Sequence, residues 1–525
     1  MLLWSVALVA ATAFAETPRR RETTTTPVPG PAGAAAATGE TVQPPVEMSP
    51  EARPAVYAPE LFAPDPGYQG QTYDVAAQLA IYGGKTRVDA PRPPIEWGYP
   101  LYDAGPIGPG INLFGSRNPA RPQLLAFGDL RYGVAYNDNG ARDSAQMALR
   151  LNLDFDLRLT ATERVHLFLR PLDNVKSGHT TRWEFGGDQN NHRDDVDLVL
   201  DLDPEALFFE GDLGQIAAGL SGKYNAWDVP VAFGLMPLLF QNGIWMEDAI
   251  LGAAITAPAM NSPRLDISNM DVTLFAGFDR VTTKAVLEPD GDRDDHDAEI
   301  YGVAVFVEAR EAYIEAGYGY TLDTKGGAAG DASYHNATLA VTRRWLGLVS
   351  NSVRLIGNFG QDHNANFTRT ADGWLLLVEN SMITSLPSTL VPYVNLFCGI
   401  DRPQSLARDF GAGGILKNTG INFETDGLTG FPKLDDSAND AWGGAAGLEY
   451  LFALDRQVIV EVATVLPFGD DDRIDRVAKG DQAAIGIRYQ QPLSKNWILR
   501  SDAILASREG ESDLAGIRFE LRLKF

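Results

Sequence analysis

The stretch ALRLNLDFDLRLTA, residues 148–161, decides the fold class. Between Leu149 and Ala161 every odd position is apolar, and between Arg150 and Thr160 every even position is polar or charged. This period of two is that of a β-strand with one apolar face and one polar face. Strands of soluble proteins usually run about five or six residues, whereas this stretch is long enough to cross a bilayer as a tilted strand.

The same alternation recurs from residue 123 to the end of the chain, with turns that contain Gly, Asp and Asn between the segments. Strands are expected near 123–137, 145–161, 164–172, 206–220, 229–241, 250–258, 270–280, 299–309, 311–321, 335–345, 350–361, 372–384, 390–399, 441–453, 456–468, 481–491, 496–508 and 513–525. In lipid, a sheet must close on itself so that no edge is left unpaired. The sequence therefore predicts an all-β protein, a closed transmembrane antiparallel β-barrel of about 16–18 strands with an aqueous lumen.

The end of the chain, GIRFELRLKF (516–525), supports this prediction. Its apolar face holds Ile517, Phe519, Leu521, Leu523 and Phe525. The strand resembles the C-terminal strand of Gram-negative outer-membrane barrels, and residues 123–525 resemble large porins and the related barrels that export alginate-type polysaccharide. The resemblance implies an outer-membrane location in a Gram-negative bacterium. It also implies contact with the lipid bilayer and lipopolysaccharide, and with the barrel-assembly machinery through the Phe525 strand.

The region before residue 123 is predicted to lie outside the barrel. LLWSVALVAATAFA (2–15) is an apolar stretch that ends in a small-residue cleavage site, so residues 1–15 are expected to be a signal peptide. Residues 16–70 are rich in Pro, Ala and Thr, and are expected to form a disordered tail. Residues 71–122 are expected to be a periplasmic transitional segment.

Composition excludes several functions. The net charge of −25 argues against a nucleic-acid partner, because phosphate binding needs basic patches. The single cysteine, Cys398, can form neither an intramolecular disulfide nor a cysteine-based metal site. The six histidines match no metal-binding or catalytic spacing. We therefore expect no enzymatic activity, no catalytic residues and no cofactor.

Strand parity identifies candidate pore-lining residues, because the polar face of each strand should meet the lumen. They are Arg131, Arg150, Asp154, Asp156, Arg158, Arg170, Glu308, Glu315, Arg488, Arg500, Arg518 and Arg522. The first strand of a closed barrel pairs with the last, so the arginines of both should share one wall. One hypothesis is a basic wall that faces a more acidic one and selects ions. The alternative is that arginines and carboxylates neutralise each other in a wet lumen.

Three segments between strands stand out. EPDGDRDDHDAE (288–299) clusters Asp290, Asp292, Asp294, Asp295 and Asp297, and is either a candidate Ca²⁺ site or a solvated extracellular loop. The uncharged run at 229–246 contains two prolines, which argue against a membrane helix, so a strand followed by a constriction loop is expected. Residues 400–440 are Gly- and Asp-rich, and are expected to form an extracellular lid or to fold into the lumen.

These features predict an outer-membrane porin for passive diffusion of small hydrophilic solutes or ions. Two alternatives stay open: an export channel for an acidic exopolysaccharide, and a non-conducting surface or structural barrel. Porins of this size are monomers or trimers, so a homotrimer is one expected assembly.

Overall fold

The computed structural model describes residues 91–98, 110–174, 179–187, 196–286, 296–326, 330–363, 369–384, 389–424, 427–452, 456–469 and 477–525. All of them belong to one compact unit, Gly84–Phe525. The expected signal peptide and disordered tail lie outside the described residues, as does much of the expected transitional segment. No helix among the described residues is both long enough and apolar enough to cross a membrane.

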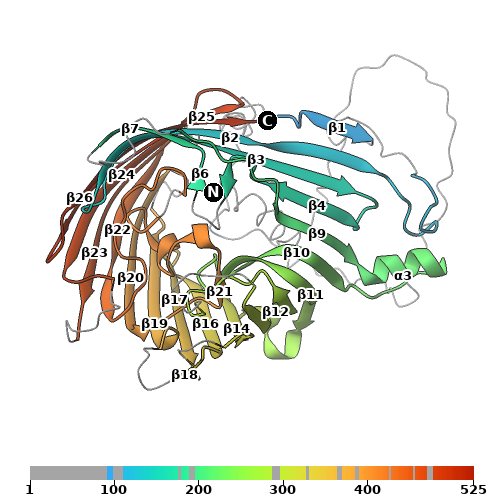
Figure 1. The fold of residues 1–525 in the computed structure, drawn as a ribbon. Helices are drawn as coiled ribbons and strands as arrows, with labels where there is room; N and C mark the ends of the chain where they lie inside the picture. The colour runs from blue at the N-terminus through green and yellow to red at the C-terminus, as the bar shows by residue number, and fades with distance from the viewer. Residues whose placement is uncertain are drawn as a thin grey trace, which may run out of the picture. The chain divides into compact units, whose positions relative to one another are not determined.

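The described residues form a closed ring of 18 antiparallel strands, which confirms the predicted fold class (Figure 1). In chain order the ring contains β2 (Gln123–Asp138), β3 (Asp143–Arg158), β4 (Arg164–Leu169), β9 (Pro204–Asp212), β10 (Pro230–Phe240), β11 (Met246–Ser262), β12 (Ile267–Asp279), β13 (Ala298–Ala309), β14 (Ala312–Asp323), β16 (Tyr334–Trp345), β17 (Val349–Phe359), β19 (Asp372–Met382), β20 (Leu390–Arg402), β22 (Ala441–Phe452), β23 (Arg456–Pro467), β24 (Gln482–Pro492), β25 (Trp497–Arg508) and β26 (Leu514–Lys524). Each expected strand overlaps one of these. The ring closes where β2 pairs with β26, from Asp129↔Lys524 to Asp138↔Ala515.

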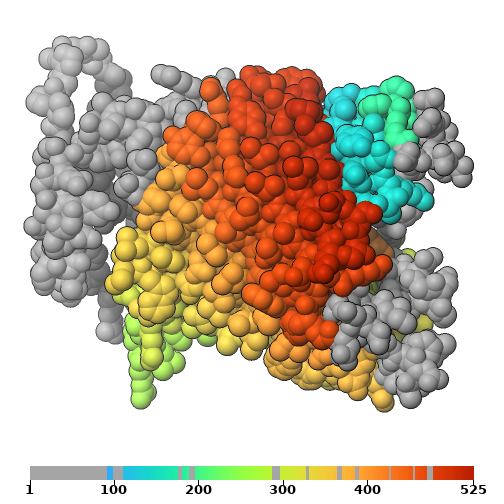
Figure 2. Space-filling model, turned by 90° about the vertical axis from the view of Figure 1, so that its left-hand side faces the viewer, coloured from blue at the N-terminus to red at the C-terminus, as the bar shows by residue number. Residues whose placement is uncertain are grey.

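Figure 2 shows this closure from outside, where the red atoms of the last strands adjoin the cyan atoms of the first. The alternation of the sequence becomes an inner and an outer face. On β26, Ile517 and Phe519 are 46% and 52% exposed on the outside, whereas Arg518 and Glu520 are each only 1% exposed. Apolar side chains therefore face outward and charged side chains face inward, as a membrane barrel requires.

Shorter strands complete the wall. β1 (Ile95–Gly98) pairs with the start of β2. β4 covers only the Leu153–Arg158 part of β3, and β7 (Arg182–Gly187) covers the Ser144–Ala148 part. Between β4 and β7 the chain forms the small hairpin β5 (Asp173–Asn174) and β6 (His179–Thr180). β8 (Val196–Asp197) then pairs with β7. The wall beside β3 is thus built from two separate strands.

The connections differ at the two ends of the barrel. At one end lie short turns, such as 310–311 and 346–348, together with the start of β2 and the end of β26. The long connections 170–203, 280–297 and 403–440 lie at the other end. In outer-membrane barrels the short turns are periplasmic and the long loops extracellular.

One strand prediction was too long. Residues 206–220 were expected to form a strand, but the strand ends at Asp212, and α3 (Leu213–Ser221) follows. Asp212 caps this helix, because its side chain accepts a hydrogen bond from the backbone N–H of Gln215, and Gly222 ends it in the left-handed conformation. An Asp three residues before a Gln is a helix-start signal that overrides the apolar alternation here.

Candidate functional site

The connection between β20 and β22 folds into the barrel. Its short strand β21 (Ala407–Arg408) pairs in parallel with Met246 and Glu247 at the start of β11. The chain after β20 therefore leaves the wall and reaches β11 across the interior, and the described part of residues 403–440 includes the orange segment inside the ring (Figure 1). Of the two arrangements expected for this segment, the structure has the fold into the lumen. We call residues 403–440 the lumen loop.

Apolar packing holds the lumen loop against one part of the wall. Leu416, Phe423 and Leu434 of the loop are at most 1% exposed. They belong to one core cluster with inward side chains of the barrel, including Ile356, Leu375, Leu377, Phe397, Ala463 and Val465. Burial of these side chains stabilises the docked loop, since each large apolar side chain removed from water contributes roughly 1.5–3 kcal/mol. The interior beside β17–β26 is therefore a packed core.

Glu461 of β23 fixes the backbone of the lumen loop. Its carboxylate accepts hydrogen bonds from the backbone N–H of Ile421 at 3.0 Å and of Asn422 at 2.9 Å. It also accepts one from Asn422 Nδ2 at 2.9 Å, and one from the Tyr393 hydroxyl. Glu461 is 0% exposed, so these donors compensate a buried charge.

A second anchor joins the lumen loop to β11. Arg408 Nη1 lies 3.2 Å from one carboxylate oxygen of Glu247, and Lys417 Nζ lies 2.8 Å from the other. Burial lowers the pKa of Arg408, and Glu247 and Asp436 partly offset this effect. The anchor ties two points in the first half of the lumen loop to the same carboxylate.

The turn between β10 and β11 also folds inward. Trp245 is 0% exposed and donates from Nε1 to Asn336 Oδ1 at 2.8 Å. Gln241 Oε1 accepts from Arg354 Nε at 3.1 Å and from the Thr338 hydroxyl at 2.9 Å. This is the position at which the uncharged run 229–246 predicted a constriction loop.

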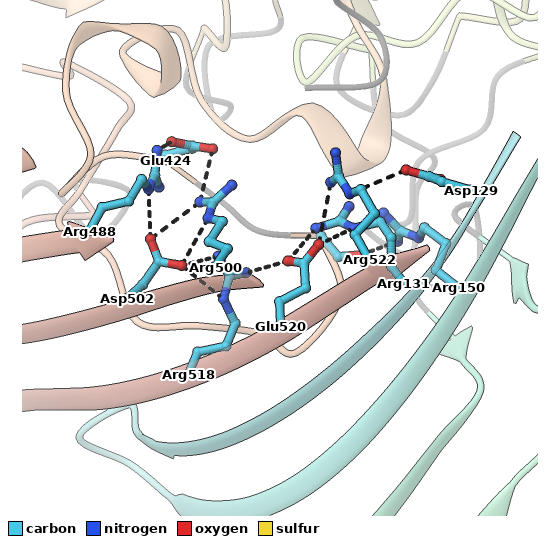
Figure 3. A network of polar contacts seen from close by, with 11 residues as sticks. Asp129, Arg131, Arg150, Glu424, Arg488, Arg500, Asp502, Arg518, Glu520 and Arg522 are labelled. Atoms are coloured by element: carbon cyan, nitrogen blue, oxygen red, sulfur yellow. Dashed lines mark hydrogen bonds and ion pairs between the residues drawn. The ribbon is translucent and has the colours of Figure 1, made fainter. Parts of the chain in front are cut away.

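The arginines of the first and last strands lie together on one wall, as Figure 3 shows. Arg131 of β2 pairs with Glu520 of β26 at 2.8 Å. Asp502 of β25 accepts hydrogen bonds from Arg488 at 2.7 Å and from Arg500 at 2.9 Å, and it pairs with Arg518. Arg522 lies 3.2 Å from Asp129, and Arg150 lies 2.6 Å from Asp173. Each of the six arginines named here therefore has a carboxylate partner.

Glu424 of the lumen loop joins this arginine wall. It lies 2.7 Å from Arg488 and 3.5 Å from Arg500. Burial opposes its ionisation, but the two guanidinium groups outweigh burial and lower the pKa of Glu424 to about 2. Of the two hypotheses for the charges of the lumen, this arrangement favours the one in which arginines and carboxylates neutralise each other.

The other candidate pore-lining residues lie on different strands of the interior. Glu308 and Glu315 lie on β13 and β14, where Glu315 is the register partner of the inward Ala340. Asp154, Asp156 and Arg158 lie on β3, and Arg170 follows β4. Parity placed all of these residues on the inner face. It could not find Arg408, Lys417 or Glu424, because they belong to the lumen loop rather than to a strand.

The wall of β3, β4 and β9 has a different character. His166 stacks on Phe208 with ring centroids 4.7 Å apart, and its Nε2 lies 3.2 Å from Glu210. The Arg170 guanidinium lies over the Phe168 ring, 5.3 Å from its centroid. Among the described residues, the Nε atoms of Arg158 and Arg170 have no hydrogen-bond partner, and neither side chain forms an ion pair. The nearest carboxylates are those of Asp156 and Glu210 for Arg158, and those of Asp154 and Glu205 for Arg170.

The acidic candidate Ca²⁺ site stays a prediction. Asp290, Asp292, Asp294 and Asp295 lie outside the described residues. Asp297 is 4% exposed and forms an ion pair with Lys325. Within the described ranges, no group of three or more His, Cys, Asp or Glu residues could hold a metal ion.

Comparison with known proteins finds likeness of architecture. No family model and no curated protein matches the chain. OccK11 (OpdR) of Pseudomonas aeruginosa is 12% identical, with a TM-score of 0.49 over 77% of this chain and 96% of its own. OccK2 (OpdF) of the same organism, solved in complex with glucuronate, is 11% identical, with a TM-score of 0.48 over 77% and 98%. Wzi of Escherichia coli, described as a carbohydrate-binding β-barrel involved in group 1 capsule assembly, is 13% identical, with a TM-score of 0.44 over 76% and 84%.

The class of the protein follows from its own strand pairing. A closed antiparallel ring with an apolar outer face and an ionisable interior is the fold of Gram-negative outer-membrane porins. Fold alone does not assign a solute, since one architecture serves many functions.

Proposed function

We propose that the chain is an outer-membrane channel for passive diffusion of small hydrophilic solutes or ions, narrowed by the lumen loop. The observation that carries the proposal is the division of the interior. One side is a packed core of loop and wall, whereas the β3–β4–β9 wall holds charged groups, including Arg158 and Arg170, which form no ion pair within the described part of the chain. Charged groups inside a closed barrel of this size are typical of a wet passage.

The proposed path runs along the β3–β4–β9 wall. Its polar side chains retain some contact with solvent: Arg164 is 22% exposed, His166 18% and Glu210 30%. A solute there would meet cations, carboxylates and aromatic faces within one small area. Such a lining favours polar solutes over apolar ones, because its side chains can replace the hydrogen bonds that a polar solute makes with water.

A non-conducting barrel is the second candidate, and the extent of the packed core favours it. The lumen loop holds apolar side chains that are fully buried against the wall, so it closes part of the cross-section. Export of an acidic polysaccharide is less favoured, because the arginines that would line its path already have carboxylate partners. A homotrimeric assembly stays a prediction.

Single-channel recording tests the proposal. The refolded protein is inserted into planar bilayers under a salt gradient. Stable unitary steps with a reproducible reversal potential support a channel. Correct folding is checked by the faster migration of the unheated barrel in detergent gels. A folded and inserted barrel that gives no conductance steps would refute the channel and support the non-conducting barrel.

A further inference from the structure

The inner faces of β13 and β14 carry two aromatic rings and two carboxylates in one small area. Phe306 of β13 is the register partner of Glu315 of β14, and Glu308 is the register partner of Tyr313. Direct partners of an antiparallel pair have Cβ atoms about 4.5–5.5 Å apart, and diagonal neighbours stay within reach of aromatic side chains. The rings and the carboxylates therefore alternate. We call Phe306, Glu308, Tyr313 and Glu315 the aromatic-acidic patch.

The patch faces the lumen. On β16 the register partner of Glu315 is Ala340. Thr338, two residues before Ala340 and on the same face of β16, donates to Gln241 of the turn that folds into the barrel. Tyr313 shares this inner face and is nevertheless 47% exposed, so its ring is in contact with solvent inside the barrel. The Phe306 ring lies beside it, with centroids 6.0 Å apart and planes inclined by 27°.

Trp245 marks the upper border of the patch. Gly317 follows Glu315 by two residues on the same face, and a Cβ at Gly317 would collide with the Trp245 ring. The inward turn between β10 and β11 therefore rests on the wall directly next to the patch. Trp245 is 0% exposed, whereas Tyr313, toward the short turns, is 47% exposed. The inner surface thus changes from packed to open at the patch, on the periplasmic side of the turn.

The carboxylates of the patch have no cation bound to them. The charged groups that act on Glu315 are Arg354 and Glu379, and these two already pair with each other at 2.9 Å. Arg344 lies on the same inner face of β16, nearer to the periplasmic turn. Within the described ranges, Glu308, Glu315 and Arg344 form no ion pair. With three carboxylates against two arginines, this part of the inner face keeps an excess of negative charge.

Rings that alternate with carboxylates suit organic ammonium ions. The face of an aromatic ring attracts a cation, and quaternary ammonium groups are bound in this way. A carboxylate beside the ring adds an opposite charge. Inorganic cations such as Ca²⁺ instead require several oxygen ligands around one point, and here the rings separate the two carboxylates. Anions would be repelled by the same groups.

We propose that the aromatic-acidic patch binds organic ammonium cations, such as choline, at the periplasmic side of the narrow section of the lumen. The Tyr313 ring contacts the methyl groups of the cation, and Glu308 and Glu315 supply the opposite charge. The site lies across the ring from β2, and so from the arginine wall (Figure 1). Passage of the bound cation through the barrel rests on the proposed channel function, whereas binding itself does not.

Binding of choline to the intact barrel tests the patch. The full chain is placed in lipid nanodiscs, choline is titrated, and saturation transfer from the protein to the choline methyl protons is followed by NMR. A neutral analogue, with carbon in place of the ammonium nitrogen, isolates the contribution of charge. The patch variant is Glu308→Gln with Tyr313→Leu. The matched control is Glu299→Gln with Tyr301→Leu, a pair on the outer face of β13 in which the Tyr301 hydroxyl donates to Glu299 at 2.6 Å.

We expect saturable binding of choline that weakens by about tenfold or more in the patch variant and is retained in the control. The neutral analogue should bind more weakly than choline by a similar factor. Equal binding of choline and the analogue would overturn the site, as would equal loss in the patch variant and the control. If the double variant does not fold, Glu308→Gln alone, which preserves side-chain size, gives the same comparison with Glu299→Gln.

Conductance of the same preparations separates the two proposals. Stable conductance steps without choline binding would leave the channel standing and remove the site. Choline binding without steps would leave the site standing and refute the channel. The two proposals therefore fail separately.

Discussion

Arg131 and Glu520 form a two-point ion pair across the line where the barrel closes. Arg131 Nε lies 2.8 Å from Glu520 Oε1, and Arg131 Nη2 lies 2.9 Å from Oε2. The first and last strands of the ring are thereby joined by side chains as well as by backbone. Charge-assisted bidentate pairs of this kind combine strength with a fixed geometry.

Glu520→Gln is expected to lower the free energy of unfolding by about 3–5 kcal/mol, because it leaves Arg131 and its neighbour Arg522 buried without a full counter-charge. Urea unfolding from liposomes measures the change. The matched control is Glu311→Gln, which breaks an ion pair to Arg343 with Glu311 85% exposed. We expect less than about 1 kcal/mol there. Equal effects of the two substitutions would show that the closing pair contributes nothing special.

Removal of the lumen loop is expected to widen the channel. The backbone N–H of Asp440 donates to the Asp401 carbonyl at 3.1 Å, so a short Gly-Ser linker can replace residues 403–438 without strain. We expect the single-channel conductance to rise by about twofold or more, because the narrowest section of a pore sets its conductance. Leu416→Ala, which only weakens docking, should lie between the deletion and the native protein. An unchanged conductance in the deletion would mean that ions bypass the loop.

Features that depend on neighbouring residues could be predicted from the sequence, whereas features that depend on contacts between distant segments could not. Strand positions and inward parity depend on neighbouring residues, so the alternation around Arg150 and the face of Arg518 could be read directly. The helix after Asp212 was missed, although its Asp and Gln spacing is a local signal. The loop partner of these arginines was not predictable, because Glu424 reaches Arg488 from a loop whose path depends on packing across the whole interior.

Docking of the lumen loop is expected to weaken in acid. The pKa of Glu424 is about 2 in the docked loop, below its ordinary value of 4.5. Its contribution to docking is therefore complete above about pH 4.5 and is lost as the pH falls toward 2. Conductance should be constant between about pH 5 and 8, and should become larger or noisier below about pH 4. Glu424→Gln should show the acid behaviour already at neutral pH.

Asp435 of the same loop gives a control of opposite sign. Burial raises its pKa, so its ionised form disfavours docking as the pH rises above the ordinary value. Asp435→Asn keeps the oxygen that accepts from the Ser437 N–H at 2.9 Å, and should make the open-channel current quieter at pH 7. If both substitutions changed the current in the same direction, the charges of these groups would not control docking.

The unpaired cations of the β3–β4–β9 wall are expected to set ion selectivity. Neutralisation by Arg158→Gln with Arg170→Gln removes two positive charges that form no ion pair within the described residues, so the permeability ratio should move toward cations by about twofold or more. Reversal potentials in a salt gradient measure the ratio. The control is Arg343→Gln, which removes a positive charge from an ion pair with the exposed Glu311. It should leave the permeability ratio unchanged. Substitution of an arginine that has an ion pair should act differently. Loss of Arg518 should lower the stability of the barrel before it alters ion selectivity, because it removes a partner of the buried Asp502. A shift for Arg343→Gln as large as that of the double variant would mean that net charge, rather than these two groups in the passage, determines which ions cross.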